Sequence, residues 1–457
     1  MIDGWKSALL VVAGTVGISV AAAAQQHQQP PPAGMAPPPR VQAGTTSTGR
    51  RKISLKEAMQ LAVKQGPDVA AARAGAEVVR ANVRKAWTNW QPNIVATGQF
   101  DRTSAPSSIP AGSLGPGSPQ ITLVGRQSWY GTFEITQPLL TPQGLFQPGI
   151  ANSAAEAADL TADQTREQIV LSVAQAYLVL QGLDGQIDAA REAEKVALRR
   201  EQDARARIAA GTDVEIALLR AQSETASARS QLASLQGQKD ATLPQLEALV
   251  GEPIEPQSAR VENFGPVGQE SAEPWESTYS VRSAIASTVS AHKTVRLDQF
   301  LWLPSVNGGF RENYTSNGGF AEKNWTNDWL VNLSLPIYDQ GVRYAQLAQD
   351  RARLSQAQAQ LASTRAQARA AWIGARANFI AQEAVLQQSV AAEQLAIRTQ
   401  VQVEASYRAG VSTSLDLSVA DQQKFAAQST TAVARAQLEI QRAALAAAEG
   451  RLYESAR

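Results

Sequence analysis

The pattern of apolar and polar residues occurs twice along the chain. Each copy has a helical segment that ends at a Trp-x-Pro tripeptide, beginning at Trp90 in the first copy and at Trp302 in the second. Two stretches of alternating residues follow, and then a long Ala-rich stretch that is interrupted at Gly211 or Gly410. A repeat of about two hundred residues indicates two copies of one architectural unit.

Alternation with a period of two predicts two strands in each copy. The strands cover about residues 92–102 and 128–138 in the first copy, and about 304–314 and 325–336 in the second. A Ser/Pro/Gly-rich segment separates the first two strands, so we expect hairpins. Each strand has one apolar and one polar face. The apolar face is expected to carry Trp129, Phe133, Ile135, Trp329, Val331 and Leu333.

Helical periodicity predicts three helices in each copy. Their expected ranges are about 54–88, 151–209 and 213–250, and then about 276–301, 341–408 and 413–454. In the first copy, apolar residues of the longest helix recur at alternating steps of four and three, which indicates a coiled-coil seam. This seam consists of Ile169, Val173, Ala176, Leu180, Leu183 and Ile187.

The same pattern divides the chain into five segments. A lysine, an apolar run and small residues predict a signal peptide at residues 1–24, and about a dozen apolar residues are few for a membrane anchor. Residues 25–50 are Pro/Gln-rich and are expected to form a flexible tail. The first repeat covers 51–250, a linker or peripheral patch covers 251–275, and the second repeat covers 276–457.

Composition excludes several classes of function. The 457 residues include 42 Lys and Arg against 41 Asp and Glu, so no basic field is available for nucleic acid. Cysteine is absent, which excludes thiol catalysis, disulfides, cysteine metal sites and a lipid-anchoring cysteine. His27 and His292 are isolated. We therefore expect no metal site, no cofactor and no enzymatic activity.

The predicted strands are the candidates for a membrane span. After the signal peptide no segment approaches eighteen unbroken apolar residues, so a span has to be built from strands. Four strands would leave two edges unpaired, whereas three chains contribute twelve strands and leave none. The pattern therefore predicts a homotrimer. Aromatic residues expected at the two membrane interfaces, with ordinary sheet packing as the alternative, are Trp90, Trp129, Trp302 and Trp325.

The chain resembles a known family, the TolC-like outer membrane efflux proteins. The segments that carry the resemblance are Ile53–Ala58 with Asp68, Ala210–Gly211 with Leu219–Gln222, and Tyr407–Gly410 with Leu415–Leu417. The first is similar to the opening helix of the family, and the others are similar to the tips of its two helical hairpins. Each motif is weak alone, but the ordered double set spans nearly everything from about Ser54 to Tyr453.

The resemblance implies a mainly α-helical protein with a β-barrel. A homotrimer would form a twelve-stranded transmembrane barrel in outer-membrane lipid, continued by a twelve-helix periplasmic α-barrel. The protein would lie in the outer membrane of a Gram-negative bacterium. A periplasmic adaptor protein and an inner-membrane pump of the RND or ABC type would dock at the tips, and the pump would supply the free energy.

Two acidic residues are candidates for a pore gate. Three copies of Asp416 around a threefold axis would form an anionic ring, which is a known selectivity device. The alternative is a solvated Asp on the surface of a helix. Asp421 is the second candidate, although the sequence departs from the family here. Val419 stands where a second acid is expected, and Asp421 stands where glutamine is common.

The glycine turns suggest further contacts at the tips. Arg207 and Arg408 precede the turns and either lock neighbouring tips through hydrogen bonds or ion pairs, or face water. Small residues at the turns would allow an adaptor hairpin to approach closely. The expected contacts are Gly211, Thr212, Gly410 and Val411.

Other functions remain open at this stage. Within the duct interpretation, efflux of drug-like or toxic small molecules is favoured over type I protein secretion. A periplasmic adaptor or another secreted coiled-coil scaffold would also show a signal peptide and heptads. An adaptor usually has a single hairpin, however, and two hairpins alternating with two strand pairs disfavour it.

Overall fold

The computed structural model describes residues 50–212, 214–257, 273–316 and 323–452. The predicted signal peptide and all but the last residue of the predicted tail lie outside these residues. The elements in chain order are β1 (Arg51–Ile53), α1 (Leu55–Gln65), α2 (Pro67–Trp87), η1 (Thr88–Trp90), β2 (Asn93–Arg102), β3 (Ser107–Ile109), β4 (Ile121–Val124), β5 (Gln127–Leu140), α3 (Pro142–Ala209), α4 (Glu215–Val250), β6 (Ile254–Pro256), η2 (Pro274–Ser277), α5 (Tyr279–Phe300), β7 (Ser305–Thr315), β8 (Trp325–Ser334), α6 (Val342–Arg408) and α7 (Ser414–Ala448).

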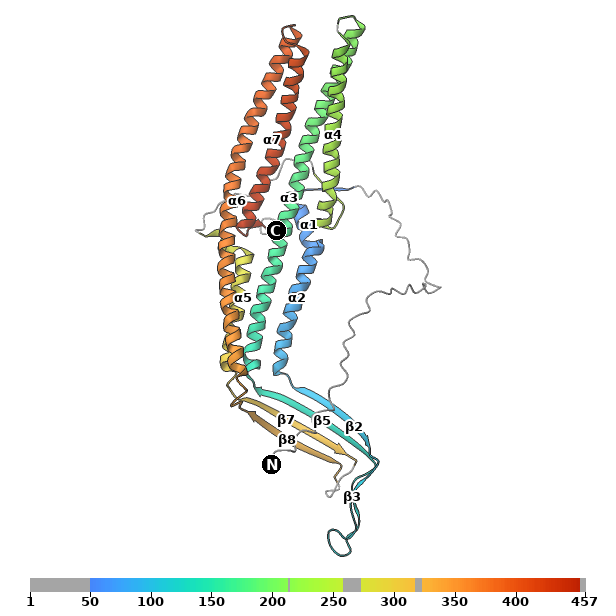
Figure 1. Ribbon diagram of the computed structural model, residues 1–457, viewed down its shortest axis with the longest axis vertical. Coiled ribbons are helices and arrows are strands. Elements are labelled where there is room, and N and C mark those ends of the chain that lie inside the picture. The colour runs from blue at the N-terminus through green and yellow to red at the C-terminus, as the bar shows by residue number, and fades with distance from the viewer. Residues whose placement is uncertain (1–49, 213, 258–272, 317–322, 453–457) are drawn as a thin grey trace, which may run out of the picture. The chain divides into compact units, whose positions relative to one another are not determined.

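The four long strands form one antiparallel sheet in the order β2-β5-β7-β8 (Figure 1). The predicted hairpins are confirmed, because β2 pairs with β5 and β7 pairs with β8. Strands β5 and β7 pair with each other and so join the two repeats in one sheet. Within the described residues, β2 and β8 are the two edge strands of this sheet.

The two faces of the sheet differ as the alternation predicts. On the polar face, Arg311 binds Glu134 at 3.1 Å across the strand pair that joins the repeats. On the other face, three aromatic pairs lie across neighbouring strands with ring centroids 4.7–4.9 Å apart, namely Phe100–Trp129, Phe310–Trp329 and Tyr314–Trp325. Trp329 is 82% exposed, so this apolar face is not covered by the described chain.

Two long helices dominate the rest of the fold. Helix α3 has 68 residues and α6 has 67, so each is on the order of 100 Å long. Helix α4 returns along α3, and α7 returns along α6 (Figure 1). The predicted seam of α3 is confirmed, since all its members except the partly buried Ala176 are buried.

The main hydrophobic core lies where α1, α3, α4 and the end of α7 meet. Val170, Leu178 and Leu246 are fully buried there. Strands β1 and β6 form a short parallel pair beside this core, and the Tyr177 hydroxyl donates to the Ile53 carbonyl at 2.9 Å. The segment predicted as a linker at 251–275 therefore includes β6, one strand of this pair.

Several predicted boundaries were wrong. The helix expected at 54–88 is two helices, because Pro67 lacks the N–H that a continuous helix needs and Gly66 is not helical. Helix α3 begins at Pro142, nine residues before the expected start. Its first turn is capped by the Thr141 hydroxyl, and proline is well tolerated at that position. The Pro and Gly residues of this segment had indicated a loop.

Two smaller corrections concern the loops and the helix ends. The segment between β2 and β5 contains a short antiparallel ribbon, β3–β4, which the Ser/Pro/Gly-rich sequence did not indicate. Helix α5 begins at Tyr279, after the short helix η2, and α7 ends at Ala448, before the positive φ of Gly450.

Candidate functional site at the helical tips

Both hairpins turn at a glycine in the left-handed conformation. The φ angle is +75° at Gly211 and +77° at Gly410. The next amide closes the turn in each case: Thr212 N–H donates to Arg207 O at 3.0 Å, and Val411 N–H donates to Ser406 O at 2.9 Å. An added Cβ would meet nothing within 4 Å at either glycine, so the backbone angle and not lack of space requires glycine. The predicted adaptor-contact residues all lie at these exposed tips.

Asp416 lies in the first turn of α7 and forms a capping box with Thr413. Its carboxylate accepts from the Thr413 N–H at 2.9 Å and from the Thr413 hydroxyl at 2.7 Å. These two hydrogen bonds, with the backbone donor as the larger cause, hold the pKa of Asp416 below its ordinary value. Asp416 is therefore an exposed, ionised residue whose orientation is set by the cap.

Asp421 has a different environment, since it is only 5% exposed and forms an ion pair with Arg200 of α3. Arg200 also donates to the Leu417 carbonyl at 3.2 Å, and its guanidinium lies 3.9 Å from Glu224 of α4. Burial lowers the pKa of Arg200, and Glu224 opposes this effect. Asp421 is thus buried in an ion pair within its own chain, whereas the prediction of a gate residue requires an exposed charge.

We call the group of Arg200, Glu224, Leu417, Ser418 and Asp421 the clasp. The Ser418 hydroxyl donates to Glu224 at 2.5 Å, so the clasp joins both helices of the first hairpin to α7 of the second. Sequence reasoning missed Arg200, Glu224 and Ser418. No local signal separates Arg200 from its neighbour Arg199, because the partners of Arg200 on α7 lie more than two hundred residues away.

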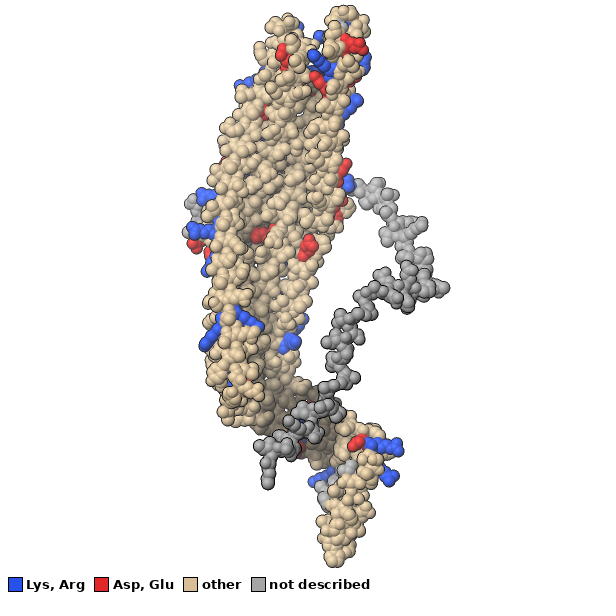
Figure 2. Space-filling model, viewed as in Figure 1, with Lys and Arg blue, Asp and Glu red and all other residues tan. Residues whose placement is uncertain are grey.

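The two arginines before the turns behave differently. Arg207 lies over the ring of Tyr407 at 5.3 Å, a cation–π contact that links the tip of the first hairpin to the second. Arg408 pairs with Glu404 on its own helix and its side chain is 76% exposed. Of these two arginines, Arg207 therefore contacts the other hairpin in the described part of the chain, whereas Arg408 pairs on its own helix. Figure 2 shows charged side chains gathered at these tips, above a shaft with few charges on the visible face.

A groove of about 580 Å³ lies between the hairpins, below the clasp. Helices α3, α4 and α7 line it with small residues and with Phe425. Further along, α3 and α7 approach closely, since a Cβ on Gly182 or Gly185 would lie within 3.0 Å of an alanine of α7. The hairpins are thus tightly packed at one end of the groove and joined by the clasp at the other.

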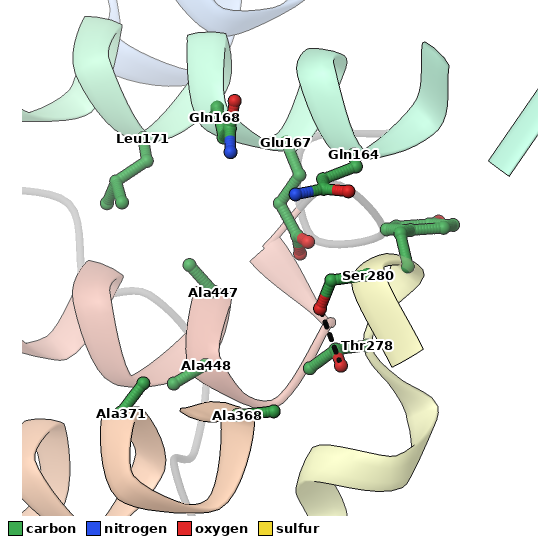
Figure 3. A pocket seen from close by; sticks show the side chains of 11 residues that line it. Gln164, Glu167, Gln168, Leu171, Thr278, Ser280, Ala368, Ala371, Ala447 and Ala448 are labelled. Carbon is green, nitrogen blue, oxygen red and sulfur yellow. Dashed lines mark hydrogen bonds between the residues drawn. The ribbon is translucent and has the colours of Figure 1, made fainter. Parts of the chain in front are cut away.

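A smaller cavity of about 180 Å³ lies near the middle of the helices, where α3, α5, α6 and α7 meet (Figure 3). The Glu167 carboxylate points toward Thr278 and Ser280 at the start of α5, and alanines form the opposite wall. Ligand sites for small molecules are usually larger than about 300 Å³. We therefore do not treat this cavity as the functional site.

Metal sites and membrane-spanning helices are both absent from the described residues. No group of three or more His, Asp or Glu side chains in these ranges is placed to hold a metal ion. No helix in the described part of the chain is long and apolar enough to cross a membrane.

Comparison with known proteins gives one family and several similar folds. Residues 58–252 and 276–451 match the outer membrane efflux protein family, and the two matched segments correspond to the two repeats. No curated protein matches the chain. The fold is similar to the outer membrane protein VceC of Vibrio cholerae, with a TM-score of 0.70 and 20% identity over 87% of this chain and 96% of that one.

Two further structures have the same fold. The CmeC outer membrane channel of Campylobacter jejuni has a TM-score of 0.73 and 16% identity, over 87% of this chain and 86% of that one. The MtrE outer membrane channel of Neisseria gonorrhoeae, in its open state, has a TM-score of 0.71 and 16% identity, over 87% of this chain and 89% of that one.

Proposed function

Because the chain belongs to the outer membrane efflux protein family, we propose that three copies of it form a passive exit duct across the outer membrane. The observation that carries this proposal is the four-stranded sheet, which has an exposed apolar face and two unpaired edges, β2 and β8, in the described chain. In hydrocarbon each unpaired backbone group costs several kcal/mol. Pairing β8 of one copy with β2 of the next would remove every edge and yield a barrel of twelve strands.

The aromatic residues support this orientation of the sheet. Trp129 and Trp325 lie at the ends of β5 and β8 that are distant from the helices, and both are more than half exposed. Trp90 and Trp302 lie just before β2 and β7, at the helical side. The two pairs would form the two aromatic girdles at the membrane interfaces.

The helices would continue the barrel into the periplasm. In three copies, the paired helices of both repeats would form a hollow cylinder of twelve helices. The tips would meet a periplasmic adaptor at Gly211, Thr212, Gly410 and Val411, and an inner-membrane pump of the RND or ABC type would drive transport. The duct itself would catalyse no reaction.

The gate would lie at the tip of the second hairpin. Three exposed Asp416 carboxylates around the axis would narrow the pore and attract cations. The capping box supports this proposal because it fixes the direction of an ionised carboxylate. Arg207 and Arg408 would help to hold the tips together, Arg207 through Tyr407 and Arg408 through a neighbouring copy.

The cargo we propose is drug-like or toxic small molecules rather than secreted protein. Deleting the gene should increase sensitivity to lipophilic drugs and leave the set of secreted proteins unchanged. Loss of one secreted protein with unchanged drug sensitivity would instead indicate type I secretion.

The test of the duct is planar-bilayer conductance of the detergent-purified protein, with its oligomeric mass measured by light scattering on the same sample. A trimer with small, cation-selective currents is the expected result. A monomer or dimer without channel activity would overturn the proposal.

A further inference from the structure

Two buried carboxylates face each other far from the tips. Asp298, near the end of α5, is 5% exposed, and Asp350, in the third turn of α6, is 2% exposed. Asp350 accepts a hydrogen bond from Gln346 at 2.7 Å and one from Arg353 at 2.8 Å. Asp298 and Asp350 interact directly, and Oδ2 of Asp298 is buried without a hydrogen-bond partner among the described residues. Two carboxyl groups can bond directly only when one of them carries a proton.

The surroundings supply too little positive charge to ionise both groups. Arg353 is the guanidinium beside the pair, and 59% of its side chain is exposed. The first four turns of α3, which pack along this end of α5, contain no charged residue. Lys293 of α5 is bound to Ser153 of α3 at 2.6 Å, and Arg343 of α6 is paired with Asp339 at 2.8 Å. Among the described residues, Arg353 is therefore the one cation that offsets the charge of the two buried carboxylates.

The first repeat lacks this pair. Asp298 lies four residues before Trp302, and the residue four before the equivalent Trp90 is Ala86. Asp350 lies nine residues after Gly341 of a Gln-Gly pair, and the residue nine after the matching Gly144 is Ser153. The basic repeat unit thus folds with Ala and Ser at these positions, so the two acids are not needed to build the helix pair.

We propose that Asp298 and Asp350 share one proton and make the contact between α5 and α6 a pH-sensitive joint. Helix α5 leads into β7, and β8 leads into α6, so the joint lies at the base of the second strand hairpin. Loss of the proton leaves two like charges in a buried contact and weakens the joint. Given the proposed function, this part of the chain faces the periplasm and experiences the pH of the medium.

The direction of the effect depends on the pKa values of the two acids. Burial and the bond to Asp350 raise the pKa of Asp298 to about 6. Although burial opposes it, hydrogen bonds from Gln346, Asp298 and Arg353 lower the pKa of Asp350. The pKa of Asp298 is higher in the folded than in the unfolded chain. The folded state therefore becomes less stable as the pH rises from about 4 to about 6, and its stability does not recover at higher pH.

Asp298→Asn tests the joint, because the amide resembles the protonated acid and does not titrate. The melting temperature of the full-length protein in detergent is measured at several pH values between 5 and 8. The wild type should lose at least about 2 °C relative to Asp298→Asn over this range. Asp188→Asn removes one charge at an exposed site of α3 and should keep the wild-type pH dependence.

A double variant distinguishes the loss of the titrating pair from misfolding of the single variant. Asp298→Ala with Asp350→Ser copies the pair that the first repeat carries, and it should also lose the pH dependence. Infrared spectroscopy reports the proton directly: the carbonyl band of a protonated carboxylic acid should titrate in the wild type, and this component should be missing in both variants.

Parallel melting curves of the wild type and Asp298→Asn between pH 5 and 8 would overturn the proposal. So would stabilisation of the wild type, but not of Asp298→Asn, by calcium chloride at pH 8, because the pair would then be a cation site. Neither measurement depends on conductance. The proposal of a pH-sensitive joint can therefore be disproved without disproving the proposed duct, and the duct can be disproved without disproving the joint.

Discussion

The chain leaves the tip of the first hairpin at Val214, which provides no side-chain cap for α4, whereas it leaves the second tip through the capping box of Thr413 and Asp416. The turns themselves are nearly identical, with φ angles of +75° and +77°. The two repeats therefore share the geometry of the turn and differ in how the returning helix begins. The second tip carries the exposed carboxylate that we propose as the gate.

The clasp connects these unequal tips, and its removal is expected to have the largest effect. Arg200→Ala would leave Asp421 buried without its partner, which destabilises a protein by about 3 kcal/mol. The neighbouring and exposed Arg199→Ala should have little effect. Chemical denaturation of both variants checks this prediction, and equal stabilities would mean that the clasp is not an important contact.

The turn glycines should tolerate substitution poorly and to the same degree. Gly410→Val and Gly211→Val each force a β-branched residue into the left-handed region, which costs about 1–2 kcal/mol. Gly374→Val, in the middle of α6 with nothing within 4 Å of its Cβ, is the control and should not destabilise the protein. Proteolysis at the tips and cross-linking to an adaptor would report the damage. Wild-type behaviour of Gly410→Val would contradict the requirement for a positive φ.

The difference between the caps can be reversed by mutation. Thr413→Ala should destabilise α7 by about 1 kcal/mol, because it removes the hydroxyl that accepts from the Asp416 N–H. Val214→Ser should stabilise α4 by about 0.5–1 kcal/mol, since Val214 already has the extended backbone of a cap residue. Hydrogen exchange in the first turns of α4 and α7 measures both changes. Equal hydrogen exchange in the first turns of wild-type α4 and α7 would contradict the proposal that the two helices begin with different stability.

The smallest effect on stability, but a specific effect on conduction, is expected for Asp416. Asp416→Ala should raise single-channel conductance and weaken block by divalent cations. Thr413→Ala serves as the control, because it disrupts the same cap and keeps the carboxylate. If both variants alter cation block equally, the cap and not an anionic ring explains the effect.

Much of the fold depends on local patterns in the sequence. The alternation of Phe133 and Ile135 with Thr132 and Glu134 predicts a strand with one apolar and one polar face. In the structure these four residues lie in β5, in regular antiparallel register with β2. The glycine turns are equally local, because Gly410 is needed for a backbone angle and not for a contact. The missed boundaries at Gly66 and Pro142 share one cause. Pro and Gly interrupt a helix in one context and begin it in another, and neighbouring contacts decide between the two.

The sequence by itself determined the two repeats, the strand pairs, the long helices and the positions of the tips, because periodicity and turn conformation depend on residues within a few turns of each other. The tertiary structure decided which charges are exposed. Asp416 and Asp421 lie only five residues apart on one helix, yet one is exposed at the tip and the other is buried against Arg200. Burial and ion pairing depend on segments more than two hundred residues away. The same holds for Asp298 and Asp350, which become a pair only when α5 and α6 pack together.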